Sequence, residues 1–261
     1  MIALVRAELR KIITRTSGRA GLVVSGLVGL ASVLALHQAS RVEGASVNAQ
    51  PLHQMVDFDA VTALAWSLSG RNFFVLPLIL LMVSAQLLAG EWAERTLRAS
   101  LVRPISRARI LAAKYAALGL YSALTVAVTV GIAAGGAGAL FGFDESPGPL
   151  LAGFAASWLC DLGLIALGLA LSVLLRSVVG VVVGAALFLM GDMALRALLR
   201  LMDVLGVLSA DQLIPFFPGN ALDAWSGYQG DWSPEAFVGL AVLIAASLTV
   251  ALAALQRADV P

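Results

Sequence analysis

Two acidic residues, Asp161 and Asp192, lie inside long apolar runs of the sequence. A charge without a partner is costly at membrane depth, and such a residue is a candidate for function. Asp161 lies near the middle of its run, where a carboxylate can line a transport pathway or pair with a neighbouring helix; both roles stay open. Asp192 precedes Arg196 by four residues, so the two side chains are neighbours on a helix, and we predict a structural ion pair.

The densest group of basic residues lies in the segment GEWAERTLRASLVRPISRARILAAK, at residues 90–114, between two apolar runs. Charges this close to membrane-spanning helices have to lie in water, on the side of the membrane that retains Lys and Arg. We therefore expect residues 91–114 to form a cytoplasmic loop that docks a partner protein. The alternative is that these basic residues only set the topology and contact anionic lipid.

The sequence contains none of the common motifs for binding a nucleotide or a catalytic metal. GxxxxGK[ST], HExxH and GxSxG are all absent, so we expect no enzyme, no cofactor in this chain and no nucleic acid partner. His37 and His53 are the only histidines and have no neighbouring ligand cluster, which predicts no metal site. The single cysteine, Cys160, is expected to pack as a small buried apolar residue.

Composition decides the class of protein that must position these residues. Hydrophobic residues make up 60% of the 261 positions and charged residues 13%, with a mean hydropathy of +0.92. A soluble domain does not have this composition. A membrane-spanning helix needs about 20 apolar residues. We predict an all-α polytopic protein, a single transmembrane domain over residues 1–261. The six predicted spans are Ala20–Leu36, Asn72–Gly90, Tyr115–Phe141, Pro149–Leu175, Val178–Leu198 and Ala236–Leu255.

The distribution of Lys and Arg predicts the orientation of these spans. Five basic residues precede the first span and six lie between the second and third, whereas the opposite side carries only Arg41, Arg71, Arg196 and Arg200. The positive-inside rule therefore places both termini in the cytoplasm. The excess of Arg over Lys, together with abundant Ala, Gly, Leu and Val, is typical of a high-GC bacterial gene. We expect the inner membrane of a bacterium.

Three segments outside the spans have recognisable patterns. Residues 1–19 place apolar side chains at helical spacing among basic ones, which predicts an interfacial helix. Residues 199–235 combine aromatic side chains with Pro215, Pro218 and Gly219, and we expect a broken segment that re-enters or caps the outer face. The other outer loop, from His37 to Arg71, is expected to contain a short amphipathic helix near residues 61–68.

The basic loop also has a specific residue order. An acid closes one span, a Thr-Leu-Arg step and R-P-x-S-R follow, and a Lys opens the next span. This order resembles that of the permease subunit of type-2 (ABC-2) ATP-binding-cassette exporters, and the predicted spans, interfacial helix and broken outer segment extend the likeness. Arg95 stands where that family has Gly, so the tight turn that Gly permits is not expected here. The matching residues are Glu91, Thr96, Leu97, Arg98, Pro104, Ser106, Arg107 and Lys114.

The resemblance implies a function for the loop and a set of partners. The loop would seat in a separate ATPase subunit that binds ATP and Mg, and two permease copies, or one with a related permease, would form the membrane part among the lipids. Two other functions stay open: an ion-coupled carrier that uses Asp161, and a membrane anchor for ATP-driven mechanical work on an outer partner. The residues expected to couple to the ATPase are Glu91, Glu94, Arg95, Thr96, Arg98, Pro104, Ser106 and Arg107.

Overall fold

The computed structural model describes residues 1–41, 46–47, 50–51, 59–73, 75–94, 105–142, 148–206, 213–228 and 230–257. These residues are helical except for short connections and a hairpin of two-residue strands, β1 (Ser46–Val47) and β2 (Gln50–Pro51). The helices, in chain order, are α1 (Ile2–Thr14), α2 (Thr16–Arg41), α4 (Ala60–Phe73), α5 (Val75–Ala93), α7 (Arg107–Phe141), α8 (Gly148–Leu175), α9 (Val178–Val204), the 3-10 helix η2 (Ile214–Phe216), α10 (Pro218–Ser226) and α11 (Pro234–Arg257).

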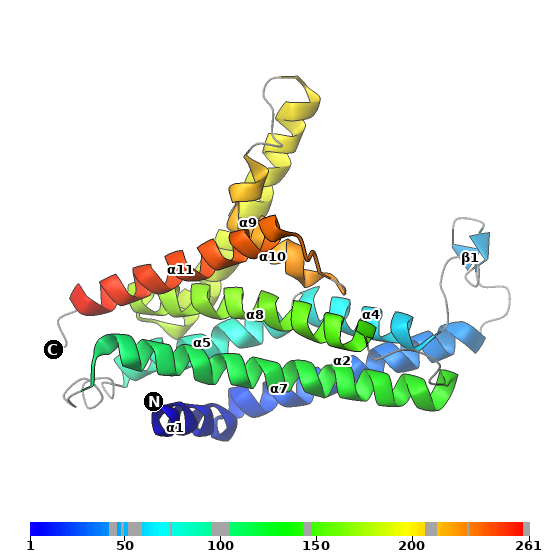
Figure 1. The fold of residues 1–261 in the computed structure, drawn as a ribbon, viewed down its shortest axis with the longest axis horizontal. Helices are drawn as coiled ribbons and strands as arrows, with labels where there is room; N and C mark the ends of the chain where they lie inside the picture. Colours follow the sequence, from blue (N-terminus) through cyan, green and yellow to red (C-terminus); the bar gives the residue numbers. More distant parts are fainter. Residues whose placement is uncertain are drawn as a thin grey trace.

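Six helices among the described residues are long and apolar enough to cross a membrane: α2, α5, α7, α8, α9 and α11. The prediction of an all-α polytopic membrane protein is thereby confirmed. The start of α1 and the end of α11 lie at the same end of the bundle (Figure 1), as an even number of spans requires. We call this end the terminal end of the bundle.

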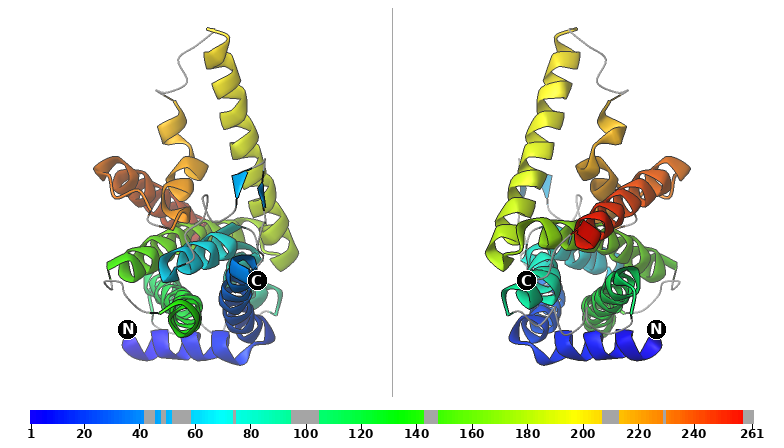
Figure 2. Two further views of the ribbon diagram at one scale, coloured as in Figure 1. Left: turned by 90° about the vertical axis from the view of Figure 1, so that its right-hand side faces the viewer. Right: turned by 90° about the vertical axis from the view of Figure 1, so that its left-hand side faces the viewer.

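The first helix lies across the terminal end instead of along the bundle. In Figure 2, α1 runs sideways beneath α2 and α7, which are seen nearly end-on. Glu8 and Ile12 are buried on its inner face, whereas Arg6 and Arg10 are exposed on the other. This orientation suits the predicted interfacial helix. The segment is shorter than expected, however, because α2 already begins at Thr16.

Residues 60–71, expected in an outer loop with a short amphipathic helix near residues 61–68, belong to the longer helix α4 inside the bundle. The α4 helix begins where the Asp59 carboxylate accepts a hydrogen bond from the Thr62 backbone N–H, at 2.7 Å. It buries apolar residues such as Leu64 and Leu68 against α2 and α7. The next helix, α5 (Val75–Ala93), continues three residues past Gly90, where the second span was predicted to end.

Side chains cap several other helix starts. Ser106 accepts a hydrogen bond from the Arg109 backbone N–H at the start of α7, and Ser177 accepts one from the Gly180 N–H at the start of α9. Pro218 and Pro234 occupy the first positions of α10 and α11, where the missing N–H costs no hydrogen bond. Within residues 199–235, where a broken segment was predicted, the described residues form the end of α9, the 3-10 helix η2, the helix α10 and the start of α11.

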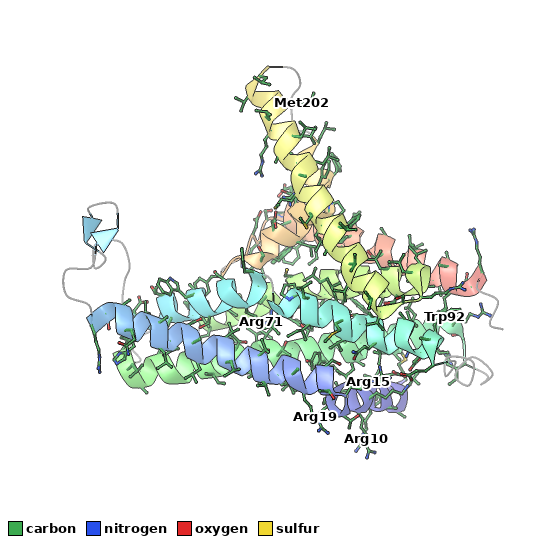
Figure 3. All side chains as sticks on the ribbon, turned by 180° about the vertical axis from the view of Figure 1, so that it is seen from behind. Arg10, Arg15, Arg19, Arg71, Trp92 and Met202 are labelled. Carbon is green, nitrogen blue, oxygen red and sulfur yellow. The ribbon has the colours of Figure 1, made fainter. Side chains whose placement is uncertain are left out.

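The α2, α4, α5, α7, α8 and α11 helices pack side by side, and α9 diverges from them (Figure 1). Close approach of α2 to α7 depends on small residues: a Cβ atom added to Gly21 would overlap the hydroxyl of Tyr121, and one added to Gly29 would crowd the Thr129 carbonyl. Most large apolar side chains of α9 are exposed, among them Leu187 and Val204. Figure 3 shows its free end, marked by Met202, far from the bundle.

Candidate functional site: buried charge networks of the bundle

Four charged side chains form a closed network of ion pairs at the terminal end of the bundle. Glu8 and Lys11 come from α1, Glu91 from α5 and Lys114 from α7, and we call this group the charge quartet. Each lysine contacts both glutamates. The Nζ of Lys11 lies 3.0 Å from Glu8 and 2.9 Å from Glu91, and the Nζ of Lys114 lies 3.2 Å and 2.8 Å from the same carboxylates.

The charge quartet is electrically balanced and mostly buried. The side chain of Lys114 is 1% exposed and those of Glu91 and Glu8 are 5% and 7% exposed, whereas that of Lys11 is 43% exposed. Lys114 also donates to the Leu87 carbonyl, at 2.8 Å. Burial lowers the pKa of Lys11, but its hydrogen bonds to Glu91 and Glu8 outweigh burial and raise that pKa above its ordinary value, so the lysine stays charged.

Further contacts fasten the same end of the bundle. Arg15, between α1 and α2, donates to the Gln86 carbonyl of α5 at 2.7 Å. Arg107, at the start of α7, donates to the carbonyls of Leu255 and Gln256 at the end of α11. A cation suits the free carbonyls of a helix C-terminus. The α1, α5, α7 and α11 helices are therefore linked where the chain enters and leaves the segment between α5 and α7.

The residues expected to contact an ATPase do not form one exposed surface in the described structure. Arg95, Thr96, Arg98 and Pro104 lie outside the described residues. Glu94 is exposed, with its carboxylate 3.9 Å from Arg15. Ser106 caps α7 and Arg107 binds the end of α11.

Glu91 differs from the expectation of an exposed polar contact. Its carboxylate is buried in the charge quartet, because α5 continues to Ala93 and turns this side chain toward α1 and α7. The predicted loop 91–114 is correspondingly shorter: residues 91–93 belong to α5 and residues 107–114 belong to α7.

A second buried network joins Asp161 of α8 to Arg71 of α4. The guanidinium of Arg71 forms a salt bridge with both carboxylate oxygens of Asp161, and it also donates to the Thr125 hydroxyl at 3.0 Å. Ser122 of α7 donates its hydroxyl to the same carboxylate. The side chains of Arg71 and Asp161 are 0% and 2% exposed. Asp161 therefore has the buried partner that the sequence did not reveal.

The Arg71–Asp161 pair lies deep in the bundle, with Arg71 near the end of α4 (Figure 3). On α7, its partners Ser122 and Thr125 lie roughly 12–16 Å along the helix from Lys114. That distance is close to half the thickness of the hydrocarbon core of a bilayer, about 30 Å. The assignment of Arg71 to the outer loop is therefore wrong: it followed from reading residues 37–71 as a loop, whereas Arg71 lies in the last turn of the buried helix α4.

The predicted ion pair between Asp192 and Arg196 is confirmed, with Arg196 Nε 2.7 Å from the Asp192 carboxylate. The pair has further partners in α10: Arg196 donates to Asp223 at 2.6 Å, and the Gly219 backbone N–H donates to Asp192 at 3.0 Å. This acid-base-acid group joins the diverging helix α9 to α10. The i, i+4 spacing predicted the first contact, whereas the contacts with α10 depend on the fold.

Gly219 provides a test of this junction, because a Cβ atom at this position would overlap the Asp192 carboxylate. We expect Gly219→Ala to separate α10 from α9 and to lower the free energy of unfolding by about 1–3 kcal/mol, the usual cost of overpacking. Thermal unfolding of the purified protein in mild detergent measures this loss. Gly191→Ala is the matched control, since no atom lies within 4 Å of a Cβ there; equal melting temperatures of the two variants would contradict the prediction.

Among the described residues, no group of His, Cys, Asp and Glu is arranged to hold a metal ion. His37 instead packs its ring edge-on against Phe141, with ring centroids 6.0 Å apart. His53 lies outside the described residues. Cys160 is buried, as predicted, and its thiol lies 3.7 Å from the Leu222 carbonyl of α10.

The fold and its buried charge networks define the chain as a multi-pass α-helical membrane protein. The chain belongs to the family described as "Protein of unknown function (DUF2705)", whose model matches residues 57–260. That match covers α4 to α11 and so includes Arg71, Glu91, Lys114 and Asp161, but not the α1 residues of the charge quartet. No curated protein matches the sequence.

Proposed function

We propose that the chain is the membrane-spanning permease subunit of an ATP-binding-cassette exporter, driven by ATP hydrolysis in a separate subunit. The observation that carries the proposal is the charge quartet, because it ties the two helices flanking the basic segment to the helix that crosses the bundle end. The residue order of that segment, similar to ABC-2 permeases, and the absence of any nucleotide-binding motif support it. Both termini would face the cytoplasm of a bacterium.

In this proposal the charge quartet transmits force. An ATPase that grips the segment between α5 and α7 pulls on Glu91 and Lys114, and their bonds to Glu8 and Lys11 pass the displacement to α1. Buried ion pairs resist separation, because pulling them apart leaves uncompensated charges away from water. The linked helices would then move as one piece instead of bending separately.

The proposal also includes partners in the membrane. Two copies of the chain, or one copy with a related permease, would sit side by side above two ATPase subunits. Large apolar side chains exposed on α9, such as Leu187 and Val204, are available to lipid or to the second copy.

The buried pairing of Asp161 weighs against the alternative of an ion-coupled carrier. The Asp161 side chain is 2% exposed, and its carboxylate is bound by Arg71 and Ser122 in the interior of the bundle. A carboxylate held in this way serves as a structural partner of Arg71. The other alternative, a membrane anchor for mechanical work, uses the same ATPase; stimulation of ATP hydrolysis by a transported substrate separates it from export.

Copurification tests the proposed function directly. The tagged chain, extracted in mild detergent from membranes of its own organism, should retain a P-loop protein in stoichiometric amount, and the complex should hydrolyse ATP. Reconstitution in vesicles follows: an exporter subunit is inactive without this ATPase. Transport by the purified chain alone would overturn the proposal.

Charge reversal at Glu94 tests the contact surface without disturbing the charge quartet. Because Glu94 is exposed at the terminal end, we expect Glu94→Lys to reduce coupled ATP hydrolysis about tenfold, a loss of about 1.4 kcal/mol of interaction. Glu235 is also exposed and lies at the start of α11, away from the terminal end. Glu235→Lys is therefore the matched control and should leave hydrolysis unchanged. If both variants hydrolyse ATP at the rate of the unaltered protein, Glu94 does not contact the ATPase.

A further inference from the structure

A cavity of about 310 Å³ lies among α4, α5, α8, α9 and α10. This volume is at the lower end of the range typical of ligand sites, roughly 300–1,000 Å³. Its wall is mostly apolar, and methionine side chains, which adapt to ligands of different shape, form part of it. Representative wall residues are Pro77, Leu81, Leu164, Leu189, Met190 and Leu222.

One side of the cavity is lined by the end of α4 and the first turn of α5. Asn72 and Phe73, the last described residues of α4, line the cavity, and the adjacent Arg71 carries a buried Nε atom with no hydrogen-bond partner among the described residues.

The cavity also has a charged edge, formed by Arg196 and Asp223. Arg196 is already held by Asp192, whose carboxylate lies 2.7 Å away. The three residues together carry one net negative charge, and the side chain of Asp223 is 62% exposed. Arg200, one turn further along α9, does not line the cavity. This edge therefore complements a positive group.

We infer that the cavity binds a single-chain amphiphile with a cationic head. The apolar chain lies between α5, α8 and α9, along Leu81 and Leu164, and the head lies at Asp223. The positive head is favoured because an edge with a net negative charge attracts cations and repels anions. Binding needs no ATPase; only the further step, export of this amphiphile, rests on the proposed function.

The sole cysteine provides the test, because Cys160 lines the cavity and is the only cysteine of the 261-residue chain. The full-length protein is reconstituted in nanodiscs of uncharged lipid, and the alkylation rate of Cys160 by N-ethylmaleimide is followed by mass spectrometry. Dodecyltrimethylammonium should slow alkylation at least fivefold, and dodecyl sulfate at the same concentration should slow it less than twofold. Equal protection by both probes, or protection by neither, overturns the inference.

Two variants separate the chain-binding part from the head-binding part. Asp223→Asn should remove the preference for the cationic probe, while Ala186→Phe, which adds volume to the cavity wall, should remove protection by both probes. If Cys160 does not react in the free protein, a Cys160→Ala/Met193→Cys variant reports instead, since Met193 lines the cavity and is 61% exposed. The same ratio of protection is then required, and its absence overturns the inference.

The outcomes for binding and for export are distinguishable. If Asp223→Asn loses its preference for the cationic probe but still copurifies with the ATPase, the result bears on ligand binding in the cavity and not on the exporter proposal. If the chain binds the probe but copurifies with no ATPase, the cavity still binds the amphiphile and the proposed exporter function is rejected.

Discussion

Replacing Arg71 with Met should lower the free energy of unfolding by about 3–5 kcal/mol, the usual cost of leaving one charge of a buried pair without its partner. The affected charge is Asp161, whose side chain is 2% exposed and whose remaining partner in the described structure is the Ser122 hydroxyl. Thermal unfolding in mild detergent measures the loss. Arg200→Met, on the exposed surface of α9, is the control and should change stability by less than about 0.5 kcal/mol.

The double variant Arg71→Met/Asp161→Leu separates the pair from its individual charges. Apolar replacement of a whole buried pair is often neutral or stabilising, so most of the lost stability should return. If the double variant folds but does not transport, the pair itself serves function. If the single variant is as stable as the unaltered protein, Asp161 does not depend on Arg71 and the carrier hypothesis regains its main argument.

Sequence reasoning found one ion pair within a helix and missed every ion pair between helices. The Asp192–Arg196 pair follows from a spacing of four residues. Lys114 and Glu8 are 106 residues apart, and Arg71 and Asp161 are 90 apart. No periodicity relates residues at such distances, because their proximity depends on which helices pack together.

The membrane-spanning helices were predicted more accurately than the contacts of their side chains. Apolar length alone predicted the spans, since no other structure satisfies the backbone of a 20-residue apolar run in lipid. Residues 60–71 were assigned to an outer loop with only a short helix near residues 61–68, because Ser67, Ser69 and Arg71 interrupt the apolar pattern. In the structure, Ser67 and Arg71 are buried: Ser67 bonds to the Ala63 carbonyl, and Arg71 finds its partner on α8.

The burial of Glu91 changes how the coupling hypothesis has to be tested. An acid that follows an apolar run is normally expected in water, and charge reversal there would probe a surface contact. Because Glu91 bonds to Lys11 and Lys114 inside the protein, its reversal would place a cation between two lysines and disrupt the fold. Substitution of Glu94 therefore tests the contact with an ATPase, and separate substitutions are needed to test the charge quartet.

Lys114→Met should detach α1 from the bundle and lower the free energy of unfolding by about 3–5 kcal/mol. It removes the most buried member of the charge quartet and leaves the carboxylates of Glu8 and Glu91 with Lys11 as their remaining quartet cation. Lys11→Met should cost much less, about 0–1 kcal/mol, because the Lys11 side chain is 43% exposed. Thermal unfolding compares the two variants, and hydrogen exchange of the backbone amides of residues 2–14 reports the release of α1.

The charge exchange Glu91→Lys/Lys114→Glu distinguishes a charge network from simple packing. It keeps the pair between α5 and α7 and the net charge of the quartet, but it places Lys11 beside a lysine and Glu8 beside a glutamate. If the contacts with α1 are electrostatic, the bundle recovers stability relative to either single reversal while the amides of α1 stay exposed to exchange. Protection of α1 equal to that of the unaltered protein would mean that apolar contacts such as Ile12 hold the helix, and a force passed through the charge quartet would then have no path to α1.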